Sequence, residues 1–289
     1  MNRRAFLAGA AALAASPLSA QAAVKIRKAC NLGMVREGST LEEKFKAAKD
    51  AGFDGVEINA PNAHDRDEIL KARDATGLII HGVVCSSHWS SPLSDASPEV
   101  RAKGLKGLEG AIDDAKAYGA ETVLLVPAVV TKAVSYADAW TRSQEEIRKA
   151  IPKAEAAKIL IAIENVWNQF LQSPLEFAKY VDDFKSPAVC AYFDVGNVIT
   201  YGWPEQWVRT LGKRIRRLHI KEYSRKKRDA EGLWKGFNVE LLEGDCDWPA
   251  VMKAVSEIGF DGWATAEVPG GDAKRLKDIA ERMDKIFKL

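Results

Sequence analysis

Four apolar runs in the second half of this chain each end on a side chain that can bind a metal: Glu164, Asp194, His219 and Glu267. A buried parallel strand is a continuous aliphatic run, so an abrupt switch to a polar side chain is typical of its carboxyl end. In α/β folds, ligands bind at that end. Three carboxylates and one imidazole make a hard, mostly oxygen donor set, which suits Mn²⁺, Mg²⁺ or Co²⁺ and accepts Zn²⁺. We therefore expect these four residues to hold one divalent metal ion, with Mn²⁺ as the first choice.

Each of these residues, taken alone, also has a structural explanation. A single Glu or Asp at a strand end is about as often a cap or a loop tether, and a single His is more often a hydrogen-bonded, half-buried side chain. If each residue had only a structural role, four consecutive strands that all end on residues able to bind a metal would be improbable. The joint pattern therefore favours a metal centre.

The elements that must position this set are eight β-rich apolar runs that alternate with amphipathic windows. We expect strands over 26–35, 55–59, 78–85, 122–127, 159–166, 189–195, 215–221 and 262–268. We expect helices over 40–51, 99–118, 136–157, 174–184, 248–258 and 272–287. Eight such units fit an α/β fold of the (β/α)₈ barrel type, a TIM barrel, as a single domain over residues 23–289. A doubly wound open sheet is the runner-up, but the turn Cys30-Asn-Leu-Gly33-Met-Val lacks the G-x-G-x-x-G pattern.

Composition sets limits on the partners. The chain has 289 residues, 47% of them hydrophobic, and 42 basic against 40 acidic residues. The charge is nearly balanced, and the one dense basic cluster, Arg225-Lys-Lys-Arg228, is interpreted as a solvated or substrate-side loop. Nucleic acid is therefore not expected as a partner. A homo-oligomer is compatible with this composition.

The N-terminus has the pattern of an export signal. Arg3-Arg4 precedes the small apolar stretch from Ala8 to Ala15, and Ala20-Gln-Ala22 offers a cleavage site. This pattern resembles a twin-arginine signal peptide over residues 1–22, which implies the twin-arginine translocation machinery as a partner and a periplasmic or extracellular protein. An uncleaved N-terminal membrane anchor is the alternative, since signals and anchors share an apolar core.

Several motifs together resemble the sugar phosphate isomerase/epimerase family of xylose isomerase-like TIM barrels. They are Gly52-Phe-Asp-Gly55-Val-Glu57-Ile, Ile163-Glu164-Asn165, Phe193-Asp194-Val-Gly-Asn197, Leu218-His219-Ile-Lys221, Gly244-Asp-Cys-Asp247-Trp248 and Ala266-Glu267. The resemblance runs from about residue 26 to the C-terminus. It implies a metal held by the four residues named above, and the chain looks most like the ketose 3-epimerases.

The same resemblance suggests substrate contacts. Cys85-Ser-Ser-His88 resembles a loop that brings a histidine to the substrate, and Arg225 resembles a substrate-binding arginine. Asn197 stands where some ketose epimerases carry a second histidine, so their sugar specificity does not transfer directly.

Three more contacts are read from the residues themselves. Glu57 would hold a substrate hydroxyl or orient His88, with a structural hydrogen bond as the alternative. Lys221 would stabilise an oxyanion or only pair with a neighbouring acid. Trp167 would form a wall that faces the sugar.

A metal between two carboxylates predicts a reaction. When a sugar carbonyl and its neighbouring hydroxyl bind the cation, the adjacent C–H becomes more acidic. With Glu164 and Glu267 on opposite sides of the substrate, one takes the proton and the other returns one, through an enediolate. We therefore expect a divalent-metal-dependent sugar isomerase or epimerase.

Two other functions remain open. The same groups could run β-elimination on a keto-sugar or glycoside, as a dehydratase or lyase. An exported sugar-binding protein on an inactive barrel belongs to another class, and it would be favoured if a ligand or a proton-transfer carboxylate were missing. Because phosphorylated sugars are chiefly cytoplasmic, export favours a non-phosphorylated sugar or keto-sugar.

Overall fold

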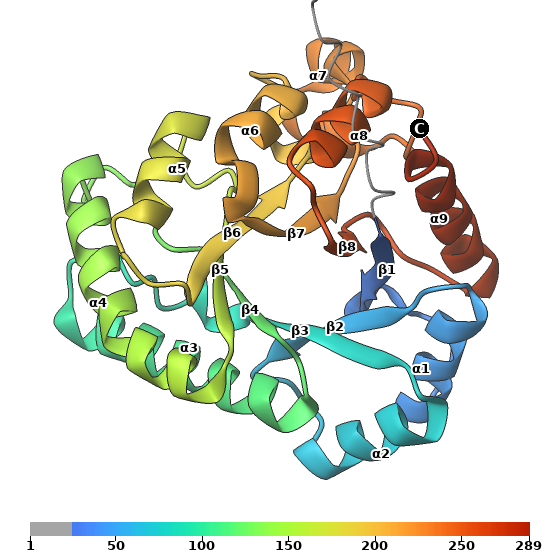
Figure 1. Cartoon of the computed structure of the whole chain (residues 1–289), viewed down its shortest axis with the longest axis horizontal. Coiled ribbons are helices and arrows are strands. Elements are labelled where there is room, and N and C mark those ends of the chain that lie inside the picture. The colour runs from blue at the N-terminus through green and yellow to red at the C-terminus, as the bar shows by residue number, and fades with distance from the viewer. Residues whose placement is uncertain (1–24) are drawn as a thin grey trace, which may run out of the picture.

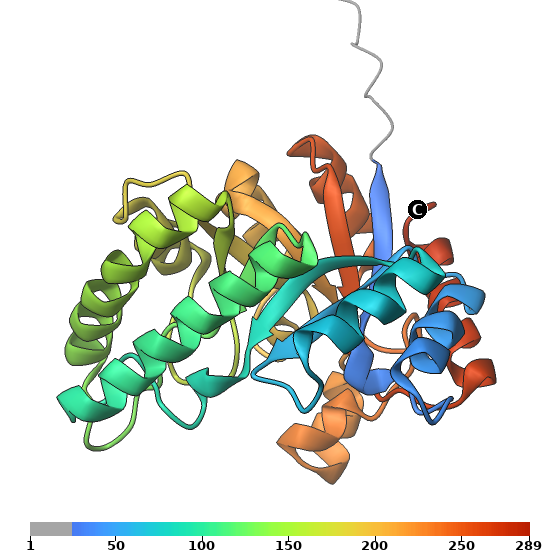
Figure 2. The ribbon, with the colours of Figure 1, turned by 90° about the horizontal axis from the view of Figure 1, so that it is seen from below.

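The predicted aliphatic runs pair with their neighbours in chain order, and the last strand pairs with the first, in the computed structural model (Figure 1). The structure describes residues 25–289. The strands are β1 (Ile26–Asn31), β2 (Gly55–Ala60), β3 (Ile79–Cys85), β4 (Thr122–Leu125), β5 (Leu160–Glu164), β6 (Val189–Asp194), β7 (Ile215–Ile220) and β8 (Gly262–Ala266). All are parallel, and β1 lies beside β8 where the barrel closes (Figure 2). The predicted eight-stranded TIM barrel, as a single domain, is confirmed.

Most strands are one to four residues shorter than the apolar runs, whereas β2 extends one residue further, to Ala60. The run over 26–35 continues beyond β1 into the 3₁₀ turn Leu32–Met34, and the run over 159–166 ends as a strand at Glu164. The predicted signal peptide, residues 1–22, lies outside the described residues, as does the predicted domain start at residue 23. Among residues 25–289, no helix has both the length and the apolar character needed to span a membrane.

Helices surround the barrel as an outer layer (Figures 1 and 2). They are α1 (Leu41–Asp50), α2 (Arg66–Thr76), α3 (Pro98–Tyr118), α4 (Tyr136–Ala157), α5 (Pro174–Asp182), α6 (Pro204–Leu211), α7 (Arg225–Glu231), α8 (Trp248–Glu257) and α9 (Ala273–Ile286). Their starts follow from local chemistry. Thr40 and Glu43 form a capping box at α1, and Ser173 caps α5 with Pro174 in its first turn.

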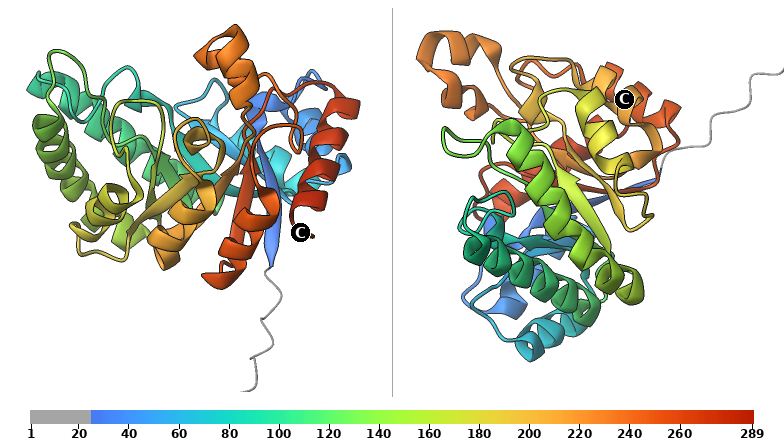
Figure 3. Two further views of the ribbon diagram at one scale, coloured as in Figure 1. Left: turned by 90° about the horizontal axis from the view of Figure 1, so that it is seen from above. Right: turned by 90° about the vertical axis from the view of Figure 1, so that its left-hand side faces the viewer.

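The basic cluster that begins at Arg225 was expected to be a loop, and this prediction is wrong. It forms most of α7, because Ser224 caps that helix by accepting a hydrogen bond from the backbone N–H of Lys227. A short 3₁₀ segment, η5 (Leu233–Phe237), follows it. This part of the chain projects from the barrel at the end opposite to the start of β1 (Figure 3). The barrel thus carries an additional helical segment, α7 and η5, after the carboxyl end of β7.

Alternation along each strand decides which side chains share a face. Residues two apart point the same way, so Tyr192 shares its face with Asp194, and Thr265 shares its face with Glu267. The main core lies between strands and helices, where Phe45, Ile112 and Phe177 are fully buried. A ligand at a strand end therefore has another residue of its own strand directly beneath it in the barrel.

Candidate metal centre

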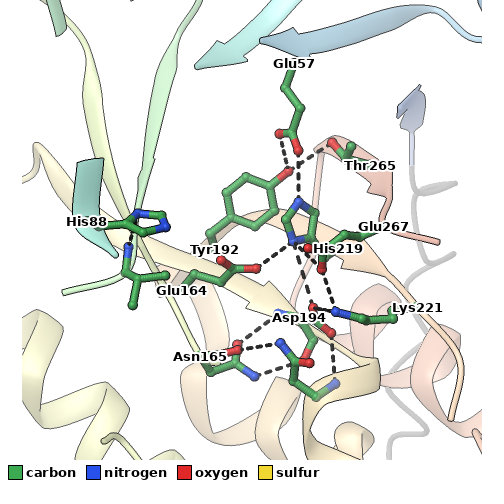
Figure 4. Close-up of polar contacts among 12 residues, drawn as sticks. Glu57, His88, Glu164, Asn165, Tyr192, Asp194, His219, Lys221, Thr265 and Glu267 are labelled. Carbon is green, nitrogen blue, oxygen red and sulfur yellow. Dashed lines mark hydrogen bonds and ion pairs between the residues drawn. The ribbon is translucent and has the colours of Figure 1, made fainter. Parts of the chain in front are cut away.

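The four predicted ligands meet at the carboxyl ends of β5 to β8 (Figure 4). One ligand atom from each of Glu164, Asp194, His219 and Glu267 lies within 4.8 Å of the others. His219 Nδ1 lies 2.7 Å from Glu164 Oε1, 3.5 Å from Glu267 Oε2 and 3.9 Å from Asp194 Oδ2. The structure thus brings together, in one place, residues that the chain separates by the helices α5 to α8.

The donor set fits a hard divalent cation. Cation–oxygen distances of about 2.0–2.6 Å place the ligands of one ion within a few ångströms of one another, as they are here. Asp194 Oδ2 is fully buried and has no hydrogen-bond partner. A buried carboxylate oxygen without a partner is costly, and it needs a compensating charge or donor. Among the described residues, the geometry therefore fits a metal ion held by these four side chains.

The first half of the barrel orients the imidazole. Glu57, at the middle of β2, has Oε1 3.0 Å from His219 Nε2, and its carboxylate is buried. A metal bound among Glu164, Asp194 and Glu267 would take the lone pair of Nδ1, and the ring hydrogen would then be on Nε2 and be donated to Glu57. Glu57 was suggested to orient His88, but its hydrogen-bond partners are His219 and Tyr192.

A polar chain continues from Glu57 toward the barrel floor. Tyr192 Oη lies 2.9 Å from both Glu57 Oε2 and Thr265 Oγ1, and Thr265 Oγ1 lies 3.0 Å from His81 Nε2. One phenol proton serves one acceptor at a time, so Tyr192 donates either to Glu57 or to Thr265. Thr265 and His81 share one further hydrogen bond. The chain thus connects Glu57, through Tyr192 and Thr265, to His81.

The barrel floor keeps His81 neutral. The His81 ring stacks on the Trp263 indole with 4.7 Å between ring centroids. The guanidinium of Arg27 lies over the Trp263 ring, 4.2 Å from its centroid. Burial lowers the pKa of His81 well below its ordinary value, and the charge of Arg217 adds to the effect. His81 is therefore a packed, structural residue of the barrel interior.

The amide side chains of Asn165 and Asn197 hold the ends of β5 and β6 together. Asn165 donates from Nδ2 to the carbonyl of Asp194 at 2.9 Å and accepts at Oδ1 from the Asp194 backbone N–H at 2.9 Å. Asn197 donates from Nδ2 to the Asn165 carbonyl, and its backbone N–H donates to Asp194 Oδ1 at 2.9 Å. Asn197 was predicted to contact substrate, but its amide N–H and backbone are used to hold the Asp194 loop.

The two predicted cationic contacts are both engaged. Lys221 Nζ lies 2.9 Å from Glu267 Oε2 and 3.6 Å from Asp194 Oδ2, which matches the alternative that it pairs with a neighbouring acid. Arg225 donates from Nε to the Ile199 carbonyl and from Nη2 to the Gly202 carbonyl. The structure therefore places Arg225 as a tether between α7 and the loop after β6, and not at the metal centre.

His88 and Trp167 lie on the rim around the centre. His88 is buried, and its Nδ1 accepts from the Val126 backbone N–H at 3.2 Å (Figure 4). Trp167 donates from Nε1 to the Asn197 carbonyl at 2.8 Å, and its ring packs 4.7 Å from the ring of Phe237. Trp167 is thus held in place beside Asn197, whose backbone N–H donates to Asp194.

Electrostatics differ between the two predicted proton carriers. Burial raises the pKa of Glu164, although the charge of His219 opposes it. Burial also acts on Glu267, but the charges of His219 and Lys221 outweigh it and lower its pKa to about 2. Burial raises the pKa of Asp194 to about 8. Two carboxylates with opposite shifts on either side of one site are typical of acid–base pairs.

One more carboxylate organises the rim without touching the centre. Glu222, directly after Lys221, accepts from the backbone N–H groups of Leu242 at 3.0 Å and Cys246 at 3.1 Å, and from Trp248 Nε1 at 2.7 Å. It also accepts from the Tyr223 backbone N–H at 3.2 Å. The motif around Gly244 and Asp247 therefore belongs to a loop held by a buried carboxylate.

A family model for the xylose isomerase-like TIM barrel matches residues 45–288. The chain belongs to this family. Among curated proteins, this TIM barrel is similar to the L-ribulose-5-phosphate 3-epimerase UlaE of Escherichia coli, with 24% identity over 268 residues that cover 86% of this chain and 92% of the relative.

Solved structures of similar fold include an L-ribulose 3-epimerase and the 3-keto-D-glucoside 4-epimerase YcjR of E. coli. The first has a TM-score of 0.75 at 18% identity and covers 91% of this chain and 95% of its own. The second has a TM-score of 0.75 at 15% identity and covers 92% of this chain and 100% of its own. At these identities the likeness concerns the fold of this xylose isomerase-like barrel.

The roles of three residues near the metal centre were not predicted from the sequence. Tyr192 and Thr265 were read as parts of strands, and Asn165 was noted only as a neighbour of Glu164. A signal for the first two exists, since each stands two residues before a predicted ligand and so shares its face. The role of Asn165 depends on a contact with the next strand, for which the local sequence carries no pattern.

Proposed function

We propose that this chain is a divalent-metal-dependent sugar epimerase or isomerase that moves a proton next to a carbonyl. The single observation that supports it most is the convergence of Glu164, Asp194, His219 and Glu267 within 4.8 Å. The activities in the names of its relatives, 3-epimerisation of L-ribulose 5-phosphate and L-ribulose and 4-epimerisation of a 3-keto-D-glucoside, agree with this chemistry.

A bound divalent cation, with Mn²⁺ as our first choice, would act as a Lewis acid on the sugar carbonyl and acidify the neighbouring C–H. Glu164 and Glu267 then act as the proton carriers, one removing the proton and the other returning one to the carbon of the enediolate. Lys221 holds Glu267 in place through its 2.9 Å contact. Glu57 holds His219 in the tautomer that leaves Nδ1 free.

We propose a non-phosphorylated sugar or keto-sugar as the substrate. The two cations predicted at the substrate, Lys221 and Arg225, are already paired with Glu267 and with backbone carbonyls. Export, which we propose from the sequence of residues 1–22, points the same way. Here the proposal departs from the phosphorylated substrate of the curated relative.

The test follows deuterium uptake from D₂O into L-ribulose, L-ribulose 5-phosphate and a methyl 3-keto-glucoside, in a protein loaded with Mn²⁺. We expect uptake into a free sugar, and losses of about 10²- to 10⁴-fold in Glu164→Gln and in Glu267→Gln. Glu145→Gln on the exposed face of α4 is the matched control. Calorimetric titration with Mn²⁺ shows whether each variant still binds the metal.

Two results would count against the proposal. Unchanged deuterium uptake in both glutamine variants would exclude the two-carboxylate mechanism. Turnover of the 5-phosphate with none of the free sugars would exclude the substrate class. Product mass separates epimerisation from β-elimination, because only elimination loses water or an aglycone.

A further inference from the structure

A cavity of about 540 Å³ opens on the rim beside the metal centre. It is lined by residues of three loops that follow β5, β6 and β7: Val166, Trp167, Gln169, Phe170, Gln172, Thr200, Tyr201, Leu233 and Trp234. Its volume is in the range of about 300–1,000 Å³ that is typical of small-ligand sites. Because these loops stand at the carboxyl ends of the strands, the cavity lies on the catalytic face of the barrel.

The lining has a definite chemical character. None of the nine lining residues carries a charge, whereas Trp167, Tyr201 and Trp234 offer aromatic surface and Gln169, Gln172 and Thr200 offer hydrogen bonds. The side chains of Tyr201 and Trp234 are 51% and 67% exposed. Exposed aromatic rings gathered around one cavity mark a binding site more often than scattered ones do. The ligand that fits is a neutral ring with an apolar face and polar edges.

The cavity walls are held in place before any ligand arrives. Trp167 is fixed by its hydrogen bond to the Asn197 carbonyl, and its ring lies 4.7 Å from that of Trp234. Gln169 adopts φ +62°, a left-handed conformation that is strained in a residue with a Cβ. The neighbouring Asn168 supports it by donating to the Ala128 carbonyl and accepting from the Phe170 N–H. A loop held in a strained conformation at a cavity indicates preorganisation for a ligand.

A short chain of side-chain contacts lies between the metal centre and the cavity. Lys221 pairs with Glu267, and its Nζ lies 4.8 Å from the centroid of the Phe237 ring. That ring packs against Trp167, which lines the cavity. Two aromatic side chains, Phe237 and Trp167, therefore stand between the lysine at the metal centre and the cavity.

We propose that this cavity is a subsite for a second ring of the substrate, so that the substrate class is a keto-glycoside and not a free monosaccharide. This inference rests on the proposed function for the first ring. The second ring is neutral and joined through a glycosidic bond. It is either a sugar or an aromatic aglycone, since both present an apolar face to indole and phenol rings.

The first experiment needs no metal. Saturation-transfer NMR on the metal-free protein compares glucose, cellobiose and phenyl β-D-glucoside. We expect the strongest transfer to the second ring of cellobiose or to the phenyl ring, which identifies the source of that ring. Trp234→Ala and Tyr201→Ala should each weaken binding of the two-ring ligand about three- to tenfold, the usual range for one aromatic contact. Trp203→Ala, an exposed indole of the same rim that does not line the cavity, is the matched control.

The second experiment separates this inference from the proposed function. In the Mn²⁺-loaded protein, Trp234→Ala should lower deuterium exchange of a phenyl 3-keto-glucoside about three- to tenfold more than that of L-ribulose. Exchange without any preference for the two-ring ligand overturns the subsite and keeps the proposed function. Second-ring binding without exchange on any keto-sugar keeps the cavity as a binding site and overturns the proposed function. If Trp234→Ala sediments as a smaller species than the parent protein and binds the ligand equally well, the cavity is an interface between copies of the chain. This result overturns the subsite.

Discussion

The two halves of the barrel contribute different side chains to the candidate metal centre. Each strand from β5 to β8 has a candidate metal ligand at its carboxyl end: Glu164 and Asp194 close β5 and β6, His219 is the last residue but one of β7, and Glu267 follows β8. In contrast, β1 to β4 end at Asn31, Ala60, Cys85 and Leu125. The first half reaches the centre through Glu57, which contacts His219 across the barrel. One half therefore supplies the ligands and the other half supplies their orientation. Substitutions in the two halves should differ in what they damage.

The largest expected effect is on a ligand of the second half. Asp194→Asn removes a fully buried carboxyl group whose Oδ2 has no hydrogen-bond partner, so it should lower Mn²⁺ affinity by at least about 100-fold. Isothermal titration calorimetry measures it. The matched control is Asp54→Asn before β2, where the carboxylate accepts from the Lys28 backbone N–H. Equal Mn²⁺ affinity in both variants would refute the division between the halves.

A smaller effect on the metal is expected from the first half. Glu57→Gln keeps the size of the side chain but removes the charge that accepts from His219 Nε2, so Mn²⁺ affinity should fall about 10- to 100-fold. Nitrogen-15 NMR of His219 in the metal-free protein gives an independent measurement: the pKa of His219 should fall in Glu57→Gln, because the charge of Glu57 is one of those that raise it. If the Mn²⁺ affinity and the pKa of His219 both stay as in the parent, Glu57 has no orienting role.

The smallest effect concerns stability and not the metal. Burial lowers the pKa of His88 to about 4, below the ordinary value of about 6.5 that the unfolded chain has. Below pH 6.5 the unfolded chain therefore takes up the proton more readily than the folded protein, and the free energy of unfolding falls as the pH drops toward 4. His88→Asn removes this contribution, so the stability difference between parent and variant should shrink from pH 7 to pH 4.5.

Urea unfolding at several pH values measures this difference, with the exposed His64→Asn as the control that keeps the parent's slope. Mn²⁺ affinity of His88→Asn should stay within about twofold of the parent, because His88 is a buried support of the β4 end. A loss of metal affinity as large as that of Glu57→Gln would place His88 with the orienting residues instead.

The parts of the fold that the sequence predicted are those in which local pattern and burial agree. Buried parallel strands read as aliphatic runs, so all eight were placed, and α4 was predicted with the bounds that the structure has, Tyr136–Ala157. The helices α2, α6 and α7 were not among the predicted helical windows, and α6 and α7 have only 8 and 7 residues, too few to show a clear period. In α7 the run of cations suggested a solvated loop, while the Ser224 cap decided for a helix.

The site divides in the same way. The convergence of the four candidate ligands could be predicted because strand ends are visible in sequence. The partners of Glu57 and Arg225 were not, because Tyr192 and the Gly202 carbonyl reach them only through the closed barrel and the folded rim. Hydrogen bonds between distant segments leave no periodicity in the chain, so the assignment of orienting and tethering roles required the structure.

The buried carboxylate of Glu222 has a consequence for motion. The segment from Leu242 to Cys246 has no helix or strand, yet two of its amides donate to that one side chain. Amide exchange with solvent requires these bonds to open. The segment should therefore exchange as slowly as strand amides and move as one body with the end of β7, so that Lys221 keeps its position while the rest of the rim fluctuates.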